Sequence, residues 1–137
     1  MSEKLLNNFI YKLNQSKKTN SNHYWMSSYD VEKAVSALLS FKEDEIKKIV
    51  SDKYWNGYPT WSSSTIFKLG PAIHVIVQET SVSYPKLFAH ISKHGKGLWA
   101  MYCLDFSKGK HSVWLAKRAM KSKDPRVRLR GAKIIPT

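Results

Sequence analysis

Residues 85–107 carry the sequence PKLFAHISKHGKGLWAMYCLDFS, which holds the clearest structural signal in the chain. Pro85 suits the first position of a helix and Gly95 suits its end, so residues 85–95 are predicted to form one helix. Residues 96–107 are apolar nearly all round, which is typical of a helix that is buried on most sides. Two such helices in succession predict a helical hairpin.

A second hairpin is predicted directly after the first. The tripeptide KGK at residues 108–110 breaks the chain, and residues 111–122 and 124–135 each show the apolar spacing of a helix. Asp124 is the expected N-cap of the last helix, and Pro125 is its expected first residue. Three apolar positions recur with the same spacing at an offset of 29 residues, namely Leu98, Cys103 and Phe106, then Val127, Ala132 and Ile135. A repeat of this period predicts stacked hairpins, each burying its apolar face on the next.

The N-terminal half is predicted to be helical but less regular. Helical spacing is found at residues 2–15 and 29–40, and a run of acidic residues indicates another helix that starts near residue 43. Loops rich in Ser and Asn, or broken by Gly and Pro, are expected at residues 16–28 and 55–65.

Residues 66–83 allow two interpretations. A short helical turn at 66–69 is expected to end at Gly70, and Pro71 suits the start of a new helix over residues 71–83. The β-branched residues of this segment also alternate, so a strand is the alternative. Helix is preferred, because nothing else in the chain resembles a strand that could pair with it.

The length of 137 residues suits one domain with one core, so residues 1–137 are predicted to form a single α-helical domain. The expected architecture is all-α, with stacked antiparallel helical hairpins. No apolar run approaches the roughly 18 residues that cross a bilayer, and the first residues lack the apolar core of a signal peptide. The single cysteine, Cys103, fits a reducing compartment. We therefore expect a cytoplasmic protein with no membrane partner.

The segment DPRVRLRGAKII at residues 124–135 resembles the start of the second helix of a HEAT-type repeat. The resemblance lies in an Asp-Pro pair, a Val-Arg pair, a small residue and a closing aliphatic pair. It implies a HEAT-like fold in which Asp124 caps the helix and Arg128 packs at the hairpin seam. The sequence departs from the pattern at Gly131, where alanine is usual, and the first 80 residues show no clean match.

Positive charge is concentrated in the C-terminal half. The formal net charge is +13, from 23 Lys and Arg against 10 Asp and Glu. Residues 1–79 carry +2, residues 80–137 carry +11, and all four arginines lie within the last twenty residues. Such segregation indicates an acidic protein patch, nucleic-acid phosphates or an anionic membrane surface as partner. The residues expected to meet the partner are Lys117, Arg118, Lys121, Arg126 and Arg130.

Aromatic residues form the second half of the predicted site. Four rings lie in or beside loops, where packing in a core explains them less well, namely Trp25, Trp55, Tyr58 and Trp61. Trp and Tyr bury a large area at low entropic cost and are common hot-spot residues of interfaces. The alternative is that these rings join the loops to the core. Trp99 and Trp114 lie on regular apolar stripes and are predicted to be core residues.

No constellation of residues predicts catalysis or metal binding. His90 and His94 lie four residues apart on one helix, but no nearby carboxylate or thiolate completes a zinc site. Cys103 lies in the most apolar helix and is expected to be an inert core residue. The acidic residues are sparse and mostly suit capping or solvent-facing positions, so no general acid–base pair is indicated. We expect no enzyme activity, no metal and no cofactor.

Two kinds of binding remain as hypotheses. As a small HEAT-like protein without catalytic residues, the chain resembles the immunity proteins that bacteria carry against secreted toxins, including those of contact-dependent growth inhibition. This resemblance implies a monomer that binds one cognate toxin, through an acidic patch of the toxin, and covers its active site. The alternative is a basic helical-repeat protein that binds nucleic acid. Protein binding is preferred, because the loop aromatics and the lack of catalytic residues favour it.

Overall fold

The structure is a computed structural model, and it describes residues 2–15, 31–55, 64–122 and 125–134. Its elements are α1 (Ser2–Gln15), α3 (Val31–Leu39), α4 (Glu43–Ser51), the 3-10 turn η1 (Lys53–Trp55), α6 (Ser64–Ser83), α7 (Pro85–His94), α8 (Leu98–Phe106), α9 (Gly109–Ala119) and α10 (Pro125–Ile134). Every regular element in these ranges is helical, which confirms the all-α fold class. The predicted loop at 16–28, most of the one at 55–65 and the predicted N-cap Asp124 lie outside the described residues.

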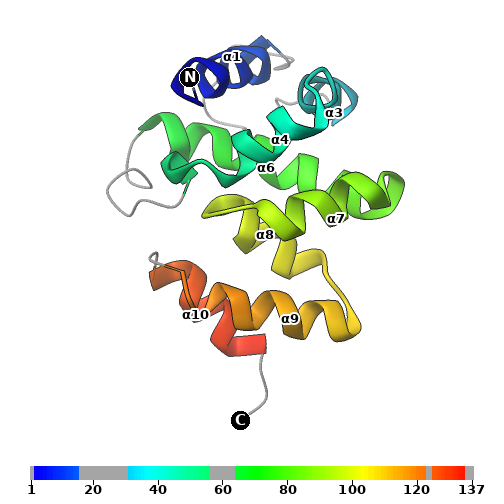
Figure 1. Ribbon diagram of the computed structural model, residues 1–137, viewed down its shortest axis with the longest axis vertical. Helices are drawn as coiled ribbons and strands as arrows, with labels where there is room; N and C mark the ends of the chain where they lie inside the picture. The colour runs from blue at the N-terminus through cyan, green and yellow to red at the C-terminus, as the bar shows by residue number, and fades with distance from the viewer. Residues whose placement is uncertain (1, 16–30, 56–63, 123–124, 135–137) are drawn as a thin grey trace.

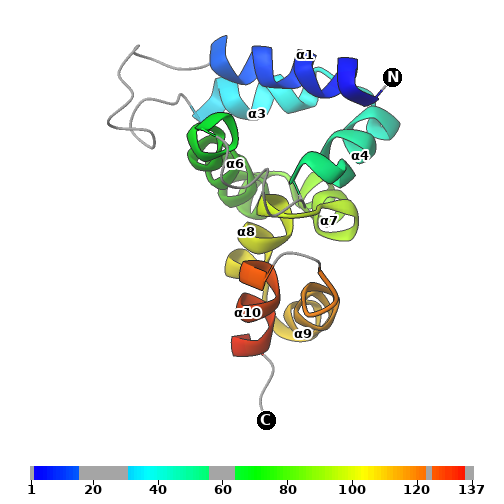
Figure 2. The ribbon, with the colours of Figure 1, turned by 90° about the vertical axis from the view of Figure 1, so that its left-hand side faces the viewer.

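The helices follow one another along a single long axis (Figure 1). α1 and α3 pack together at one end, and α9 and α10 pack together at the other end, near the C-terminus. α8 lies between these layers, in contact with α6 and α7 and also with α9 and α10. The same order is visible after a turn of 90° (Figure 2). The two most basic helices therefore form a terminal layer that rests mainly on α8.

α6 runs without interruption over 20 residues, so residues 71–83 are helical and the strand alternative is wrong. The expected break at Gly70 and new start at Pro71 are also wrong, because Pro71 lies inside the helix. α6 packs against α3, α7 and α8, and its middle is buried at Leu69, Ala72, Ile73, Val75, Ile76 and Val77. Burial on several sides compensates for the hydrogen bond that proline cannot donate and for the lower helix propensity of β-branched residues.

No described helix has both the length and the apolar composition needed to span a membrane.

A cluster of aromatic rings forms the centre of the core. Trp99 of α8 contacts both Phe9 of α1 and Trp55 of η1, with ring centroids 5.9 Å apart in each pair. All three side chains are fully buried, and the indole nitrogen of Trp55 donates a hydrogen bond of 2.7 Å to the carbonyl oxygen of Ile49. The expectation that Trp55 binds a partner is therefore wrong, because η1 folds it back under the end of α4. Trp99 is confirmed as a core residue.

α9 and α10 approach each other closely at Gly131. A Cβ atom at this position would lie 2.6 Å from the carbonyl oxygen of Ala116 and 3.0 Å from the Cβ of Ala119. Contact between the helices thus explains why residue 131 is a glycine. The internal repeat is matched in burial at one pair of positions, because Leu98 and Val127 are both buried. It is not matched at the next pair, where Cys103 is fully buried and Ala132 is exposed.

Candidate protein-binding surface

The described structure brings together only part of the predicted site. Trp25, Tyr58 and Trp61 lie outside the described residues. Because Trp55 is in the core, the aromatic half of the prediction has no described member at the surface. The basic half lies on α9, on α10 and just after α9, where Lys117, Lys121 and Arg126 are exposed and Arg118 and Arg130 are partly buried.

The outer face of α9 carries both apolar and basic side chains. Trp114 is 47% exposed, Val113 is 38% exposed and Met120 is 45% exposed. These residues and three exposed lysines recur every three or four positions, and such positions share one face of a helix. We define the α9 surface as Lys110, Val113, Trp114, Lys117, Met120 and Lys121.

The prediction that Trp114 is a core residue is wrong. The inner face of α9 is formed instead by Leu115, Ala116 and Ala119. Four apolar residues in succession, 113–116, make more than one full turn of a helix, so they do not indicate which side is buried. The signal that could have done so is the lysine spacing, because lysines four positions before Trp114 and three and seven positions after it mark its side as exposed.

Two neighbours on α9 hold the ring of Trp114. The ring of His111 is stacked on the indole, with centroids 5.7 Å apart and planes inclined by 16°. The guanidinium of Arg118 lies over the same indole, 5.9 Å from its centroid. His111 precedes Trp114 and Arg118 follows it, so the two side chains approach the ring from opposite directions along the helix. The ring is therefore fixed in orientation although almost half of it is exposed.

Arg118 was expected to meet a partner, but its side chain turns inward. Its guanidinium donates one hydrogen bond to the carbonyl oxygen of Gly95, at 2.6 Å, and another to that of Ser92. These carbonyls lie at the end of α7, where the helix leaves its last acceptors without donors. Burial lowers the pKa of Arg118 from its ordinary value, yet a guanidinium keeps its charge in proteins. Arg118 thus joins α9 to the end of α7.

Arg130 is also engaged within the molecule. Its guanidinium lies 3.1 Å from a carboxylate oxygen of Asp105 on α8, and both side chains are partly exposed. Burial raises the pKa of Asp105, whereas the charge of Arg130 acts in the opposite direction. The pair connects α10 to α8, so Arg130 contributes less free charge to a partner surface than expected.

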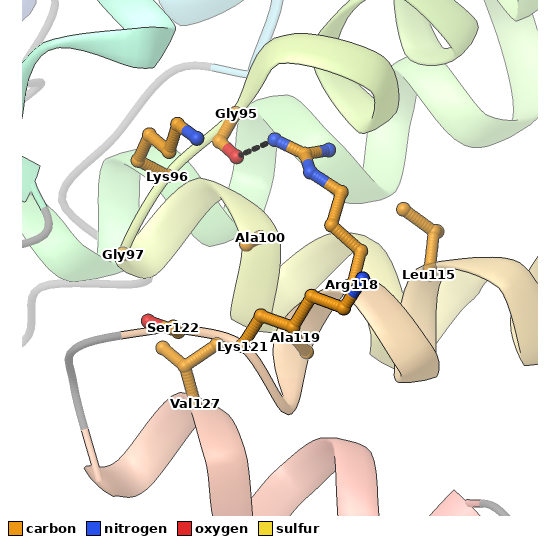
Figure 3. A pocket seen from close by; sticks show the side chains of 10 residues that line it. All are labelled: Gly95, Lys96, Gly97, Ala100, Leu115, Arg118, Ala119, Lys121, Ser122 and Val127. Atoms are coloured by element: carbon orange, nitrogen blue, oxygen red, sulfur yellow. Dashed lines mark hydrogen bonds between the residues drawn. The ribbon is translucent and has the colours of Figure 1, made fainter.

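A cavity of about 360 Å³ adjoins the α9 surface, between the α7–α8 turn, α9 and the start of α10 (Figure 3). Its apolar lining is formed by Ala100, Leu115, Ala119 and Val127. Of the described residues that line it, three are basic, namely Lys96, Arg118 and Lys121, and none is acidic. Figure 3 shows Arg118 reaching from α9 to Gly95 along this cavity.

Cys103, His90 and His94, the other side chains with reactive groups considered in the sequence, lie outside the α9 surface. Cys103 is fully buried, and burial raises the pKa of its thiol to about 12. The rings of His90 and His94 are 4.8 Å apart on α7, and Nδ1 of His90 lies 3.6 Å from a carboxylate oxygen of Glu43. Burial, with a smaller contribution from His90, lowers the pKa of His94. In the ranges that the structure describes, no group of three His, Cys, Asp or Glu could hold a metal ion.

Comparisons with family models, with curated proteins and with solved structures found no match for this chain. The nature of its partner is therefore inferred from the chemistry of the α9 surface.

Proposed function

We propose that this protein is a non-catalytic binding module that contacts an acidic protein through the α9 surface. The observation that carries the proposal is the exposure of Trp114. The two other tryptophans in the described ranges, Trp55 and Trp99, are fully buried, whereas Trp114 is 47% exposed. An exposed indole beside Val113 and Met120 makes an apolar patch of the kind that a partner covers. Tryptophan is also among the residues most enriched at interface hot spots.

The charge of the α9 surface indicates the chemistry of the partner. α9 contains no Asp or Glu, and the α9 surface places three exposed lysines around its apolar residues. These lysines belong to the half of the chain that carries +11. Interfaces commonly have an apolar centre and a polar rim of complementary charge. A partner for this surface must therefore supply carboxylates around an apolar patch.

The contacts of the Trp114 ring favour a protein over nucleic acid. A base of single-stranded nucleic acid binds by stacking on an open ring face. His111 is stacked on the indole and Arg118 lies over it, so part of the ring surface on which a base would stack is already occupied. A protein side chain can instead pack against the exposed part of the ring without displacing either.

We further propose that the partner is a cognate bacterial toxin, bound 1:1, and that the bound protein covers the active site of the toxin. This finer proposal is supported by the resemblance to immunity proteins and by the α9 surface, which offers a partner an apolar centre with a charged rim. The HEAT-like stacking of α7–α10 as two hairpins belongs to the same proposal, and the short HEAT-type segment supports it.

Capture from a nuclease-treated lysate of the source cells tests the first proposal. The immobilised protein is expected to retain an acidic protein, and Trp114→Ala is expected to weaken that binding about 30-fold, which is the loss typical of a hot spot. Tyr11→Ala is the matched control, because Tyr11 is a 63% exposed aromatic residue on α1, at the opposite end of the molecule. Equal retention by wild type and Trp114→Ala, or retention of nucleic acid alone when nuclease is omitted, would overturn the proposal.

Growth measurements test the finer proposal. Expression of the retained protein alone should arrest growth, and co-expression of this chain should restore it. A retained protein that does not inhibit growth would refute the toxin assignment while leaving the binding module intact.

A further inference from the structure

The cavity beside the α9 surface holds more positive charge than the described residues neutralise. The guanidinium of Arg118 bonds only to two main-chain carbonyl oxygens, and no described carboxylate pairs with it. The end of a helix supplies only about half a negative charge to such a cation. Lys96 and Lys121 line the same cavity, and none of the described residues that line it is acidic. A carboxylate from outside would therefore find complementary charge there.

The walls of the cavity are fixed by the fold. At the α7–α8 turn, Gly97 has a φ of 51°, a backbone conformation that L side chains rarely adopt. The amide of Lys96 donates a hydrogen bond of 2.9 Å to the carbonyl oxygen of Val50, which ties the turn to the end of α4. On the other side, the close contact at Gly131 sets the spacing of α9 and α10. A cavity formed in advance binds a ligand with less loss of conformational freedom.

We propose that this cavity is an anchor pocket for the acidic partner, in which an apolar side chain of the partner rests on Ala100 and Leu115 and a neighbouring carboxylate pairs with Lys96 and Lys121. The inference rests on the proposed function, because it requires an acidic protein on the α9 surface. The volume of the pocket, about 360 Å³, lies at the lower end of the usual range of ligand pockets, about 300–1,000 Å³. That size suits one side chain with its adjoining backbone.

The pocket is continuous with the α9 surface. Lys121 belongs to both, and Arg118 joins them because it lies over Trp114 and also reaches Gly95. A segment that covers Trp114 can therefore place its next residues in the pocket. The pocket determines which segment binds, since it requires an apolar residue beside an acidic one.

Short peptides serve as probes, and backbone amide NMR shifts of the isotope-labelled full chain are the measurement. An acetylated and amidated pentapeptide containing Glu-Leu-Glu is expected to shift the amides of Lys96, Gly97, Ala100 and Ser122, with a dissociation constant on the order of 1 mM. Peptides containing Gln-Leu-Gln or Glu-Ser-Glu should each bind at least fivefold more weakly. No shifts at these amides with Glu-Leu-Glu, or equal binding of all three peptides, would overturn the proposal. A thymidine oligonucleotide that binds there more tightly than the peptide would also overturn it.

Variants of the pocket test separately the contribution of its charge and that of its apolar lining to peptide binding. The double variant Lys96→Glu/Lys121→Glu should weaken the Glu-Leu-Glu peptide at least tenfold, and Ala100→Met, which fills the apolar lining, should weaken it at least fivefold. Lys93→Glu is the matched control, because Lys93 is an exposed lysine of α7 that does not line the pocket, and its effect should stay below about twofold. A pocket variant that binds the peptide as wild type does would refute the assigned contacts.

The same variants keep the two proposals distinguishable. If Trp114→Ala abolishes capture of the protein partner but Ala100→Met does not, the α9 surface is the interface and the anchor pocket is refuted. If the peptide binds the pocket but no acidic protein is captured through Trp114, the proposed function is refuted, whereas the binding properties assigned to the pocket are not.

Discussion

Replacement of Gly131 by alanine tests how tightly α9 and α10 pack. The added Cβ would lie 2.6 Å from the carbonyl oxygen of Ala116 and 3.0 Å from the Cβ of Ala119. The carbonyl oxygen belongs to the backbone of α9 and cannot rotate away, so the helices must separate. Overpacking costs about 1–3 kcal/mol, whereas the gain in helix propensity from Gly to Ala is about 1 kcal/mol. We expect Gly131→Ala to lower the free energy of unfolding by about 1 kcal/mol.

Urea unfolding followed by circular dichroism measures this change, and a thermal scan should show a fall in Tm of about 4 °C. Ala132→Gly is the matched control, because Ala132 is the next residue of α10 and is exposed. It reports helix propensity alone and should lower the free energy of unfolding by about 1 kcal/mol. If Gly131→Ala instead stabilised the protein by about that amount, propensity alone would describe the site and the tight contact would be refuted.

Three further predictions concern side chains whose pKa is shifted mainly by burial. Arg118→Met should lower the free energy of unfolding by about 2 kcal/mol, because two hydrogen bonds to the end of α7 are lost; Arg118→Lys, which lacks the forked geometry, should recover at most half of that loss in the same urea assay. Burial raises the pKa of Asp105, so the folded protein binds this proton more readily than the unfolded chain, and the stability contributed by the group grows as pH falls through the folded pKa. The free energy of unfolding of wild type, relative to that of Asp105→Asn, should therefore rise as pH is lowered toward 3.8, the ordinary pKa of aspartate. Urea unfolding at several pH values measures this difference, and a difference that does not change with pH would contradict the prediction. Burial raises the pKa of the Cys103 thiol to about 12, so a disulfide reagent should label Cys103 only after unfolding in guanidinium chloride, whereas rapid labelling of the native protein would show that the thiol is accessible.

The bounds of α7 and the start of α10 could be predicted because they are marked locally, whereas the break expected at residues 108–110 is wrong, since α9 begins at Gly109. Pro85 starts α7, Gly95 ends it, and Pro125 starts α10, as the sequence indicates. These signals depend on the backbone properties of proline and glycine and need no knowledge of tertiary contacts. Pro71 shows the limit of the same rule. It marks a helix start by sequence, but burial of α6 on several sides keeps the helix continuous through it.

The candidate site could be predicted only in part, because a continuous apolar run does not show which of its side chains face the core and which face the solvent. Trp55 follows a helix end and precedes a loop, yet η1 turns it into the core. Trp114 lies in a regular apolar run, yet it faces outward. Tertiary packing against Trp99 places Trp55 in the core. Trp114 is held at the surface by His111 and Arg118, which are its neighbours on the same helix.

The arginines contribute less to the partner surface than the formal charge implies. Arg118 bonds to the end of α7, Arg128 donates a hydrogen bond of 2.8 Å to the carbonyl oxygen of Ser122, and Arg130 lies 3.1 Å from Asp105. The charge that the α9 surface offers is therefore carried by lysines. Arginine is preferred for forked recognition of carboxylates and of phosphates alike, so the lysines of the α9 surface are expected to act as exposed point charges around its apolar residues.

Exposed lysines and the apolar patch should control different steps of binding. An exposed ion pair contributes only about 0.2–1 kcal/mol to affinity, but surface charges attract an oppositely charged partner during encounter. Burial of Trp114 develops after encounter and should mainly set the rate of dissociation. For the captured partner, Lys117→Glu should thus slow association about tenfold at low salt and change dissociation less than about threefold, and Trp114→Ala should do the reverse. Surface plasmon resonance at two salt concentrations separates these rates, and a Lys117→Glu variant that acts only on dissociation would show that the lysines form buried contacts with the partner.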